Sequence, residues 1–309
     1  MISVVIPTYK NKEQFIKNLG HNLFFLKECE VIVVNDSPQE SLMKDLMIFP
    51  QIQLIENKTN LGFAGAIHRG IQQAKGNFIL LLNNDVLLND NFFLKAANIL
   101  QKDEKMFAVS FAQKEKNITL VGKNQIYWKS GFFQHKKADN FKLGINGWAE
   151  GGACIINKKL YEKVGGFDPL YSPFYWEDVD LSYRAWKNGY QILFDPSIVV
   201  IHHHKSTIGK FFNSNWITEI AYRNQFIFIW KNIEDPVLLL SHLIHLLYSL
   251  PIMMFKDFAY VKGFIKAVFL LPAIIAKRKH YAITDYEVLS KFSCYSGVYP
   301  VRKKSRNSV

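Results

Sequence analysis

The segment Phe78-Ile-Leu-Leu-Leu-Asn-Asn-Asp85 joins a run of mostly aliphatic residues to two amides and a carboxylate. A short apolar run bounded by polar residues is typical of a strand that is buried on both faces of a sheet. The same pattern occurs earlier in the chain, at Ser3–Pro7, Glu30–Val34 and Gln51–Ile55. The sequence therefore predicts a series of buried strands, each of which ends in a polar cluster.

Stretches with helical apolar spacing separate these strands, at Lys12–Leu26, Gln39–Met47 and Phe63–Ala74. Strand–helix alternation with short connections predicts an α/β fold, in which a mostly parallel sheet carries helices on both faces. The carboxyl ends of parallel strands meet at one edge, and ligands bind in the crevice outside it. The polar clusters Pro7-Thr8-Tyr9 and Asn35-Asp36-Ser37 should therefore share a binding site with Asn83-Asn84-Asp85.

Two common phosphate-binding loops are missing from the sequence. No G-x-G-x-x-G follows the first strand, and no G-x-x-x-x-G-K-[ST] occurs, so the usual dinucleotide and P-loop sites are not expected. Asp36 can still accept hydrogen bonds from a nucleobase or a ribose hydroxyl. Asn60-Leu-Gly-Phe-Ala-Gly-Ala66 opens a helix whose first amides can face an anion. An ordinary glycine turn at a helix start explains that segment equally well.

A divalent cation is expected beside Asp85. Mg²⁺ and Mn²⁺ prefer oxygen ligands and usually keep waters and substrate phosphates in their shell. Later in the chain, His202-His-His204 follows the strand-like run Ile198–Ile201. Because alternate residues of a strand share a face, His202 and His204 would point together, and one of them would complete a metal site with Asp85. An exposed or structurally satisfied histidine is the alternative.

A second acidic cluster, Glu177-Asp-Val-Asp180, begins a predicted helix over Val179–Lys187 and follows the aromatic stretch Tyr171–Trp176. Acidic residues in the first turn of a helix favour its dipole whether or not they do chemistry. Aromatic crowding would, however, raise the pKa of a carboxyl group and make it a better base. The residues alone leave both roles open.

The formal charge of +12 is concentrated near the C-terminus, since residues 251–309 carry 11 basic and 3 acidic side chains. A nucleic-acid-binding protein would spread its basic residues over the folded body, so nucleic acid is not expected as a partner. Pro236–Phe255 has no charged side chain, and Lys262 and Lys266 lie one helical turn apart. This pattern predicts an apolar, basic appendage that associates with an anionic membrane surface.

Cysteine spacing and the N-terminal sequence indicate a reducing compartment. Cys29, Cys154 and Cys294 are far apart and show no disulfide or zinc spacing. The chain enters its first strand directly, without a signal-peptide pattern, which predicts a cytosolic catalytic part. If Lys277–Lys279 and Arg302–Arg306 also stay cytosolic, the number of membrane crossings is even. We expect none, with helices in the interface; a two-span hairpin and a soluble helical cap are the alternatives.

These motifs together resemble those of bacterial family 2 glycosyltransferases with a GT-A fold, especially a rhamnosyltransferase-like branch. The resemblance covers residues 1–230 and rests on the following segments in order: Val4-Val-Ile-Pro-Thr-Tyr9, Val33-Val-Asn-Asp-Ser37, Asn60–Ala66, Leu81-Leu-Asn-Asn-Asp-Val86, Glu150-Gly-Gly-Ala-Cys154, Val164-Gly-Gly-Phe-Asp168, Trp176-Glu-Asp-Val-Asp-Leu181 and Val200-Ile-His-His-His204. It implies a Rossmann-like catalytic domain over 1–230. Residues 231–309 would then be the helical tail, at the cytoplasmic face of a bacterial inner membrane.

The resemblance also implies roles for individual residues. Asp178 is similar to the family's catalytic base, and Glu177 to the residue that positions it or contacts the acceptor. Asp85 matches the metal-binding aspartate of a DxD-type motif, and His202 the histidine after the last core strand, so Mg²⁺ or Mn²⁺ is implied. The implied donor site consists of Pro7, Thr8, Tyr9, Asp36, Asn60, Gly62, Asn84 and Asp85, and the acceptor site of Gly151, Gly152 and Trp176.

The reaction implied by this resemblance is transfer of a sugar, with inversion, from a nucleoside diphosphate to a hydroxyl group. The branch favours dTDP-rhamnose as donor and a lipid-linked or polysaccharide acceptor in cell-surface glycan synthesis. A galactosyl-, glucosyl- or N-acetylglucosaminyltransferase that uses a UDP-sugar is an alternative. A nucleotidyltransferase and a non-catalytic sugar-nucleotide-binding protein are alternatives of another class, and a homo-oligomer is left open.

Overall fold

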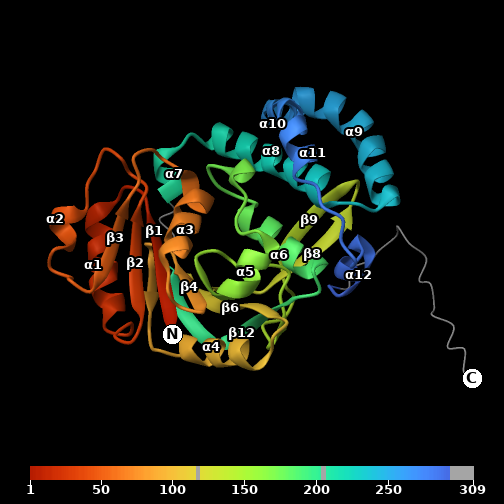
Figure 1. Cartoon of the computed structure of the whole chain (residues 1–309). Coiled ribbons are helices and arrows are strands. Elements are labelled where there is room, and N and C mark those ends of the chain that lie inside the picture. The colour runs from red at the N-terminus through yellow and green to blue at the C-terminus, as the bar shows by residue number, and fades with distance from the viewer. Residues whose placement is uncertain (116–118, 203–206, 293–309) are drawn as a thin grey trace, which may run out of the picture.

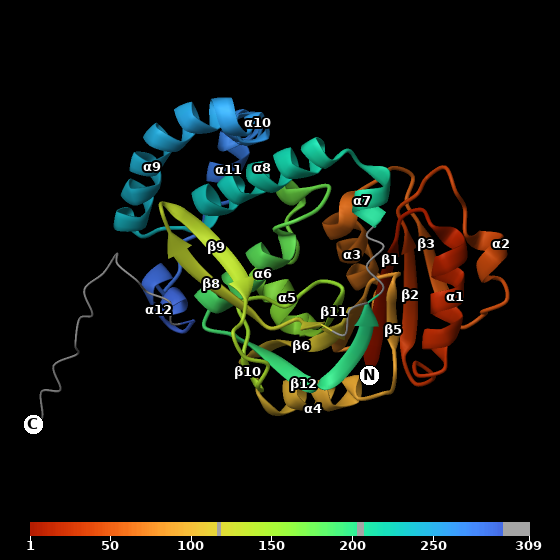
Figure 2. The same ribbon diagram turned by 180° about the vertical axis from the view of Figure 1, so that it is seen from behind.

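The computed structural model describes residues 1–115, 119–202 and 207–292. A twisted sheet carries helices on both faces, and further helices are layered over one end of the molecule (Figure 1; Figure 2 gives the view from behind). The strands are β1 (Ile2–Thr8), β2 (Glu30–Asn35), β3 (Ile52–Glu56), β4 (Phe78–Leu82), β5 (Val86–Leu88), β6 (Met106–Lys114), β7 (Leu120–Val121), β8 (Asn124–Lys129), β9 (Phe132–Lys137), β10 (Gly144–Ile145), β11 (Ala153–Asn157) and β12 (Gln191–His202). The helices are α1 (Lys12–Leu23), α2 (Met43–Leu46), α3 (Gly62–Gln73), α4 (Phe93–Lys102), α5 (Lys158–Val164), α6 (Glu177–Lys187), α7 (Thr207–Phe211), α8 (Ser214–Asn232), α9 (Pro236–Lys256), α10 (Phe258–Phe269), α11 (Leu271–Ala276) and α12 (Asp285–Ser290).

The main sheet has the strand order β10-β12-β6-β11-β4-β1-β2-β3, with β5 paired to β12 and β7 paired to β6. Pairing is parallel between β1 and β2, β1 and β4, β2 and β3, and β6 and β12. β11 runs antiparallel between β4 and β6, and β8 and β9 form a separate hairpin. The predicted mostly parallel α/β sheet is confirmed.

The central strands separate two apolar cores. Val4 and Ile6 of β1 pack into the core that includes residues of α1 and α4, whereas Val5 packs into the core shared with α3 and α6. All three side chains are buried. A strand that contacts a core on each face must be apolar at every position, which explains its unbroken hydrophobic sequence.

The four predicted strands are present as β1 to β4, and the first and third predicted helices as α1 and α3. The prediction of a helix over Gln39–Met47 was wrong in extent, because only Met43–Leu46 is helical. The Asn35 amide donates to the carbonyl of Glu40 (2.7 Å), and the Glu56 carboxylate accepts from the backbone of Leu42 (2.8 Å). These side chains hold the preceding residues in turns instead of a helix.

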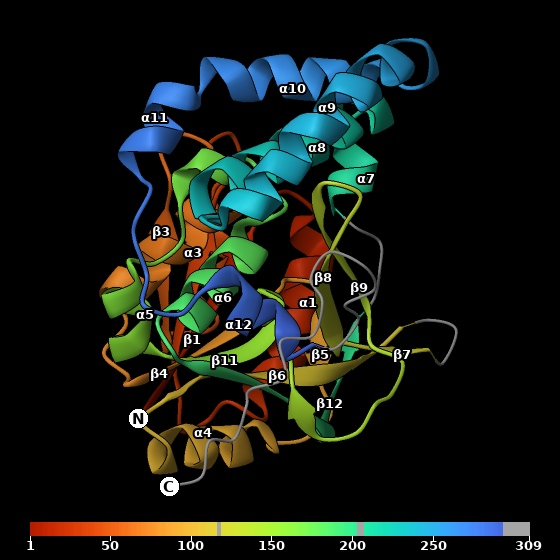
Figure 3. The ribbon, with the colours of Figure 1, turned by 90° about the vertical axis from the view of Figure 1, so that its right-hand side faces the viewer.

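Helices α9, α10 and α11 lie over α8 at one end of the molecule (Figure 3). The predicted domain boundary at residues 230 and 231 falls within α8, and one core includes buried side chains from both sides of it, among them Phe228, Leu238, Ala267 and Leu289. The division into a catalytic domain and a tail stays a prediction. His203, His204, Cys294 and the basic run Arg302–Arg306 lie outside the described residues.

Candidate functional site

A cavity of about 630 Å³ opens at the carboxyl ends of the parallel strands. Every site residue predicted from the sequence lines it: Pro7, Thr8, Tyr9, Asp36, Asn60, Gly62, Asn84, Asp85, Gly151, Gly152, Trp176, Glu177, Asp178 and His202. Strand ends that are far apart in the chain meet here because parallel pairing aligns them. The grouping of these residues is therefore a property of the fold, whereas their individual roles stay predictions.

Asp36 organises one end of the cavity, which we call the donor end, at the carboxyl ends of β1, β2 and β4. Its carboxylate accepts hydrogen bonds from the Asn57 side chain (2.7 Å) and the Leu61 backbone (2.8 Å). Burial outweighs these bonds and raises the pKa of Asp36. Beside it, the Asn84 side chain donates to the hydroxyl of Thr8 (3.1 Å). The donor end is thus preorganised by contacts among its own polar residues.

The glycine-containing loop at the start of α3 closes against a distant segment. Gly62 has a φ of +73°, and a Cβ there would stand 2.7 Å from the carbonyl oxygen of Pro173. The next backbone amide, that of Phe63, donates to the same oxygen (3.0 Å). Only glycine fits this left-handed, closely approached position. The amide of Phe63 is therefore engaged within the protein.

Asp85 and His202 form a pair on the cavity wall, with 3.2 Å between the carboxylate Oδ1 and the imidazole Nε2. The other ring nitrogen of His202 lies 2.8 Å from the side-chain oxygen of Gln113. Burial opposes protonation of His202, but the hydrogen bond and charge of Asp85 raise its pKa overall. A carboxylate and an imidazole suit Mn²⁺, and the carboxylate alone suits Mg²⁺, when phosphate and water supply the other ligands. No cluster of three or more His, Cys, Asp or Glu side chains with metal-binding geometry occurs in the described ranges.

Glu177 and Asp178 begin α6 at what we call the base end of the cavity, with Glu150 nearby. Burial and the negative charge of Glu150 raise the pKa of Asp178 to about 7. Glu177 is more deeply buried, and burial together with Asp178 raises its pKa well above the usual range. Among the described residues, Oε2 of Glu177 has no hydrogen-bond partner. Near neutral pH, Asp178 is thus balanced between its two protonation states and can act as a base.

The sequence reasoning missed several residues at the base end. Glu150 accepts a hydrogen bond from Asn124 (2.8 Å) and another from Gln113. It lines the cavity and begins the Glu-Gly-Gly motif noted in the sequence, so that motif could have identified it as a site residue. His135 lies between Trp148 and Trp176, with ring centroids 4.9 and 5.4 Å away. It comes from the β8–β9 hairpin, whose sequence carries no comparable signal.

The predicted acceptor glycines are also packing positions. A Cβ at Gly152 would stand 2.4 Å from the side chain of Asn83, and a Cβ at Gly151 would stand 2.8 Å from the ring of Phe63. Residues of the donor end therefore press directly on this backbone. Close packing alone accounts for glycine at both positions. Their role in binding an acceptor therefore stays a prediction.

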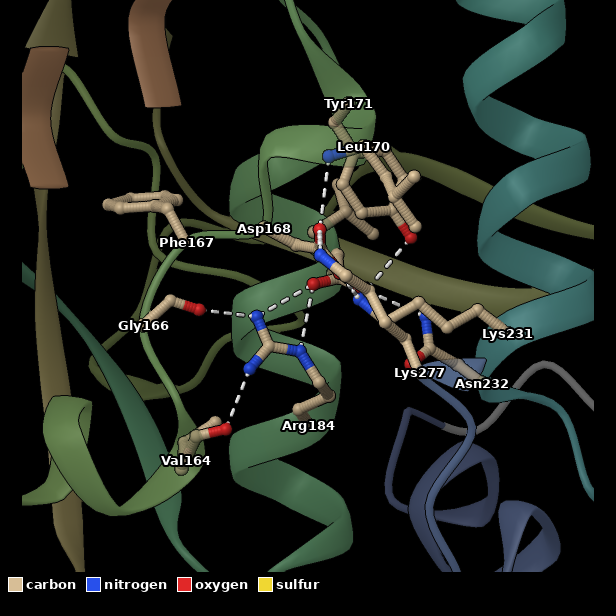
Figure 4. A network of polar contacts seen from close by, with 12 residues as sticks. Val164, Gly166, Phe167, Asp168, Leu170, Tyr171, Arg184, Lys231, Asn232 and Lys277 are labelled. Atoms are coloured by element: carbon tan, nitrogen blue, oxygen red, sulfur yellow. Dashed lines mark hydrogen bonds and ion pairs between the residues drawn. The ribbon is translucent and has the colours of Figure 1, made fainter. Parts of the chain in front are cut away.

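A buried charge network supports α6 (Figure 4). Asp180 accepts from Arg184 (2.7 Å), Lys231 (2.8 Å) and Asn232 (2.8 Å). Burial alone would raise the pKa of Asp180, but Arg184 and Lys231 hold it well below its usual range. Lys231 also reaches Asp168 (2.6 Å), which receives Lys277 from beyond α11 (2.6 Å). The network therefore joins α6 to α8 and to the C-terminal helices.

A comparison with known families decides the classification. The model of the family described as Glycosyl transferase family 2 matches residues 3–165, more than half of the chain. The chain belongs to glycosyl transferase family 2. The resemblance to family 2 is confirmed, the rhamnosyltransferase-like branch stays a prediction, and the sheet described above is the GT-A fold.

Individual relatives of this family 2 chain are distant. It is 38% identical over 64 residues to N-acetylglucosaminyl-diphospho-decaprenol L-rhamnosyltransferase of Mycobacterium tuberculosis, which covers 21% of the chain and 20% of the relative. It is 22% identical to poly-beta-1,6-N-acetyl-D-glucosamine synthase of Staphylococcus epidermidis, over 67% of the chain and 51% of the relative. The chain thus spans about half or less of the length of these relatives.

Among solved structures, GalNAc-T7 with UDP, GalNAc and Mn²⁺ is similar in fold, with a TM-score of 0.62 and 14% sequence identity. The similarity covers 91% of the family 2 chain and 58% of GalNAc-T7. At this identity the comparison establishes the fold alone.

Proposed function

We propose that this protein is an inverting glycosyltransferase that moves a sugar from a nucleoside diphosphate to a hydroxyl group of a lipid-linked or polysaccharide acceptor. One observation carries the proposal: a single cavity holds the Asp85–His202 pair as well as Asp178, whose pKa is raised to about 7. A departing nucleoside diphosphate needs a cationic partner, and an attacking hydroxyl needs a base. The cavity offers residues for both tasks.

In the proposed reaction, Asp178 accepts the proton of the acceptor hydroxyl as its oxygen attacks the anomeric carbon. The bond from that carbon to the diphosphate breaks on the opposite face, so the configuration inverts. Glu177 faces the same cavity with a buried oxygen that lacks a partner among the described residues, which suits a contact to the acceptor. Trp176 and His135 line the same end and suit contacts to a sugar ring.

Asp85 and His202 would hold Mn²⁺ or Mg²⁺, and the cation would supply positive charge next to the departing diphosphate. Thr8, Asp36, Asn60 and Asn84 would bind the nucleoside part, since they line the donor end of the cavity. Gln113 orients His202 through the ring nitrogen that does not face Asp85.

dTDP-rhamnose is the proposed donor, supported by the motif resemblance and by the L-rhamnosyltransferase relative. A UDP-sugar is the second candidate, because the other relative is an N-acetylglucosamine polymer synthase and the neighbouring solved structure contains UDP. Both relatives carry names of enzymes that build bacterial glycans, which supports a role in cell-surface glycan synthesis.

We also propose that the protein binds the cytoplasmic face of a bacterial inner membrane through α9–α11. Within the described part of the chain, α9 is the one helix long and apolar enough to cross a bilayer. One of its faces is exposed, including Leu243 (59%), Leu247 (75%) and Phe255 (89%). Isolated exposed apolar residues are normal, but a continuous exposed face marks an interaction surface.

The opposite face of α9 is docked on the protein, which favours an interfacial helix over a spanning one. His242 is buried, and its ring lies 2.7 Å from the carbonyl oxygen of Gly131 and accepts from the indole of Trp230 (3.0 Å). A transmembrane position would break both contacts. An interfacial helix keeps them and immerses its other face in lipid.

A donor screen with the purified full-length protein tests the transferase proposal. The probes are dTDP-rhamnose, UDP-N-acetylglucosamine, UDP-glucose and UDP-galactose, each with Mn²⁺, Mg²⁺ or a chelator. The acceptor probe is N-acetylglucosamine linked through diphosphate to farnesol. Release of dTDP that depends on the acceptor and the cation is expected. Failure of every nucleotide sugar to bind or react would refute the proposal.

Vesicle flotation tests the membrane proposal. Leu247→Glu should lower binding to phosphatidylglycerol vesicles, whereas Leu143→Glu is the matched control, since Leu143 is 61% exposed outside α9. Neither exposed position should alter the fold. Equal binding of both variants and the unmodified protein would contradict the assignment of α9 to the membrane.

A further inference from the structure

The backbone immediately before α6 is strained. Tyr175 has a φ of 71° and Trp176 a φ of 74°, so two successive residues with a Cβ occupy the left-handed region. Such residues cost free energy relative to glycine and persist only where the surroundings impose them. Both residues line the cavity, and the helix that follows them begins with Glu177 and Asp178. The strain therefore lies directly beside the carboxylates of the base end.

Asn224 of α8 forms hydrogen bonds with the backbone of the loop over residues 171–176. Its side chain is fully buried, and its Nδ2 lies 2.9 Å from the carbonyl oxygens of Tyr171 and Phe174 and 2.8 Å from that of Tyr175. An amide has two N–H groups, so these three carbonyls share them. The neighbouring Arg223 guanidinium donates to the carbonyl of Ser172. Asn224 and Arg223 of α8 thus donate to the carbonyls of Tyr171, Ser172, Phe174 and Tyr175.

The first turn of α6 is also held in place by hydrogen bonds and ion pairs. The Asp180 backbone donates to the carbonyl of Trp176 (2.8 Å), and the Asp180 carboxylate accepts from the hydroxyl of Tyr171 (2.8 Å). Asp180 is itself fixed by the charge network of Figure 4. Asn224 and Asp180 therefore both hold the segment that contains the strained pair, and neither of these residues lines the cavity.

We propose that Asn224 is a positioning residue, which rests on the proposed transferase function: its amide keeps Tyr175 and Trp176 left-handed and thereby aims Glu177 and Asp178 into the cavity. In the described part of the chain, the side-chain hydrogen bonds of Asn224 go to Arg223, Tyr171, Phe174 and Tyr175, none of which we assign to the donor end. Loss of the amide should therefore displace the base and leave nucleotide binding intact. A merely structural asparagine would instead lower stability and affect both ends of the cavity alike.

The test compares Asn224→Ala in two backgrounds, Tyr175→Gly and Tyr175→Ala. Both backgrounds lack the tyrosine ring, but only glycine adopts a positive φ without cost. In the alanine background, Asn224→Ala should lower turnover of dTDP-rhamnose about 100-fold, the scale expected for a misplacement of about 1 Å. In the glycine background the loss should be about 10-fold or less. If Asn224→Ala does not fold, Asn224→Ser is used in its place, because serine keeps one hydrogen-bond donor.

Two readouts do not depend on turnover. Affinity for dTDP and UDP with Mn²⁺, measured by calorimetry, should change by less than about threefold in every variant. The ¹⁹F resonance of 5-fluorotryptophan at position 176, assigned with Trp176→Phe, should move in Asn224→Ala and return toward its original position with Tyr175→Gly. An unmoved resonance, or equal losses of turnover in both backgrounds, would overturn the proposal. Absence of any nucleotide-sugar turnover in the unmodified protein counts only against the transferase function.

Discussion

The donor end and the base end of the cavity are built in different ways. At the donor end, Thr8 ends β1, whereas Asp36 and Asn84 come one and two residues after β2 and β4, and these side chains contact residues of neighbouring strand ends. At the base end, Glu177 and Asp178 follow two left-handed residues that are held by Asn224, a residue some fifty positions later in the chain. The first end is a consequence of parallel strand pairing, and the second depends on a distant helix.

Because of this difference, nucleotide binding and base catalysis should depend on different stabilising contacts. The donor end forms where the parallel strands pair, and Thr8, Asp36 and Asn84 themselves do not have a positive φ, although Lys10 and Asn11, which follow Tyr9, are left-handed. The base end stores strain and holds the half-buried Asp178, whose pKa is raised to about 7, so it must be stabilised by contacts with other segments. Substitutions at the two ends should therefore give different kinetic signatures.

The largest effect is expected from Asp178→Asn, which removes the base and keeps its shape. Transfer should fall by about 10³-fold or more, since general-base catalysis contributes up to about 10⁴-fold. Calorimetric affinity for dTDP or UDP with Mn²⁺ should stay within a few-fold of the original. Full transfer activity in this variant would remove Asp178 from the role of base.

Lys231→Met tests the buried charge network that supports α6. It leaves Asp168 and Asp180 short of a buried positive charge, so the free energy of unfolding should fall by about 3 kcal/mol. Lys136→Met is the control, because Lys136 and its partner Asp139 are both exposed (38% and 72%), so loss of this ion pair should cost under about 1 kcal/mol. Urea denaturation measures both. Equal losses would show that the network does not stabilise the fold.

Asp85→Asn probes the donor end with a substitution of the same size. In the presence of Mn²⁺, affinity for the nucleotide should fall by about 10- to 100-fold, because the cation loses a charged ligand. In the presence of a chelator, the variant and the original protein should bind equally. A variant that keeps its Mn²⁺-dependent gain in affinity would separate Asp85 from the cation.

The last prediction concerns pH alone and follows the ionisation of Asp178. Because Asp178 must be ionised to accept a proton, turnover should rise about tenfold per unit at low pH and level off above a pH of about 7. The raised pKa also means that the folded state holds this proton more tightly than the unfolded chain, whose value is 3.8. That contribution to stability is present below about pH 4 and is lost as the pH rises through 7.

Denaturation at pH 5 and pH 8 checks the second part of this prediction. Asp178→Asn should be more stable than the original protein at pH 8, and its stability should vary less between the two values. A stability difference that does not depend on pH would indicate that Asp178 is not the group concerned.

Periodicity in the sequence predicted much of the fold correctly. The runs Ser3–Pro7 and Phe78–Leu82 are central strands, and their apolar character follows from burial on two faces. The helix expected over Gln39–Met47 was too long, because the side chains of Asn35 and Glu56 capture the backbone of that segment. These contacts come from side chains at the ends of β2 and β3, so the apolar spacing within Gln39–Met47 does not predict them.

The sequence by itself determined which residues end each strand, and a parallel sheet necessarily brings such residues to one edge. The order of strands and polar clusters along the chain is therefore enough to assign Asp36 and Asp85 to one site. Only the tertiary structure decided how Asp178 is presented, which surfaces of α9 are covered, and that Glu150 raises the pKa of Asp178. These properties arise from contacts between segments far apart in the chain, such as Asn224 with Tyr175, and local sequence carries no information about such distances.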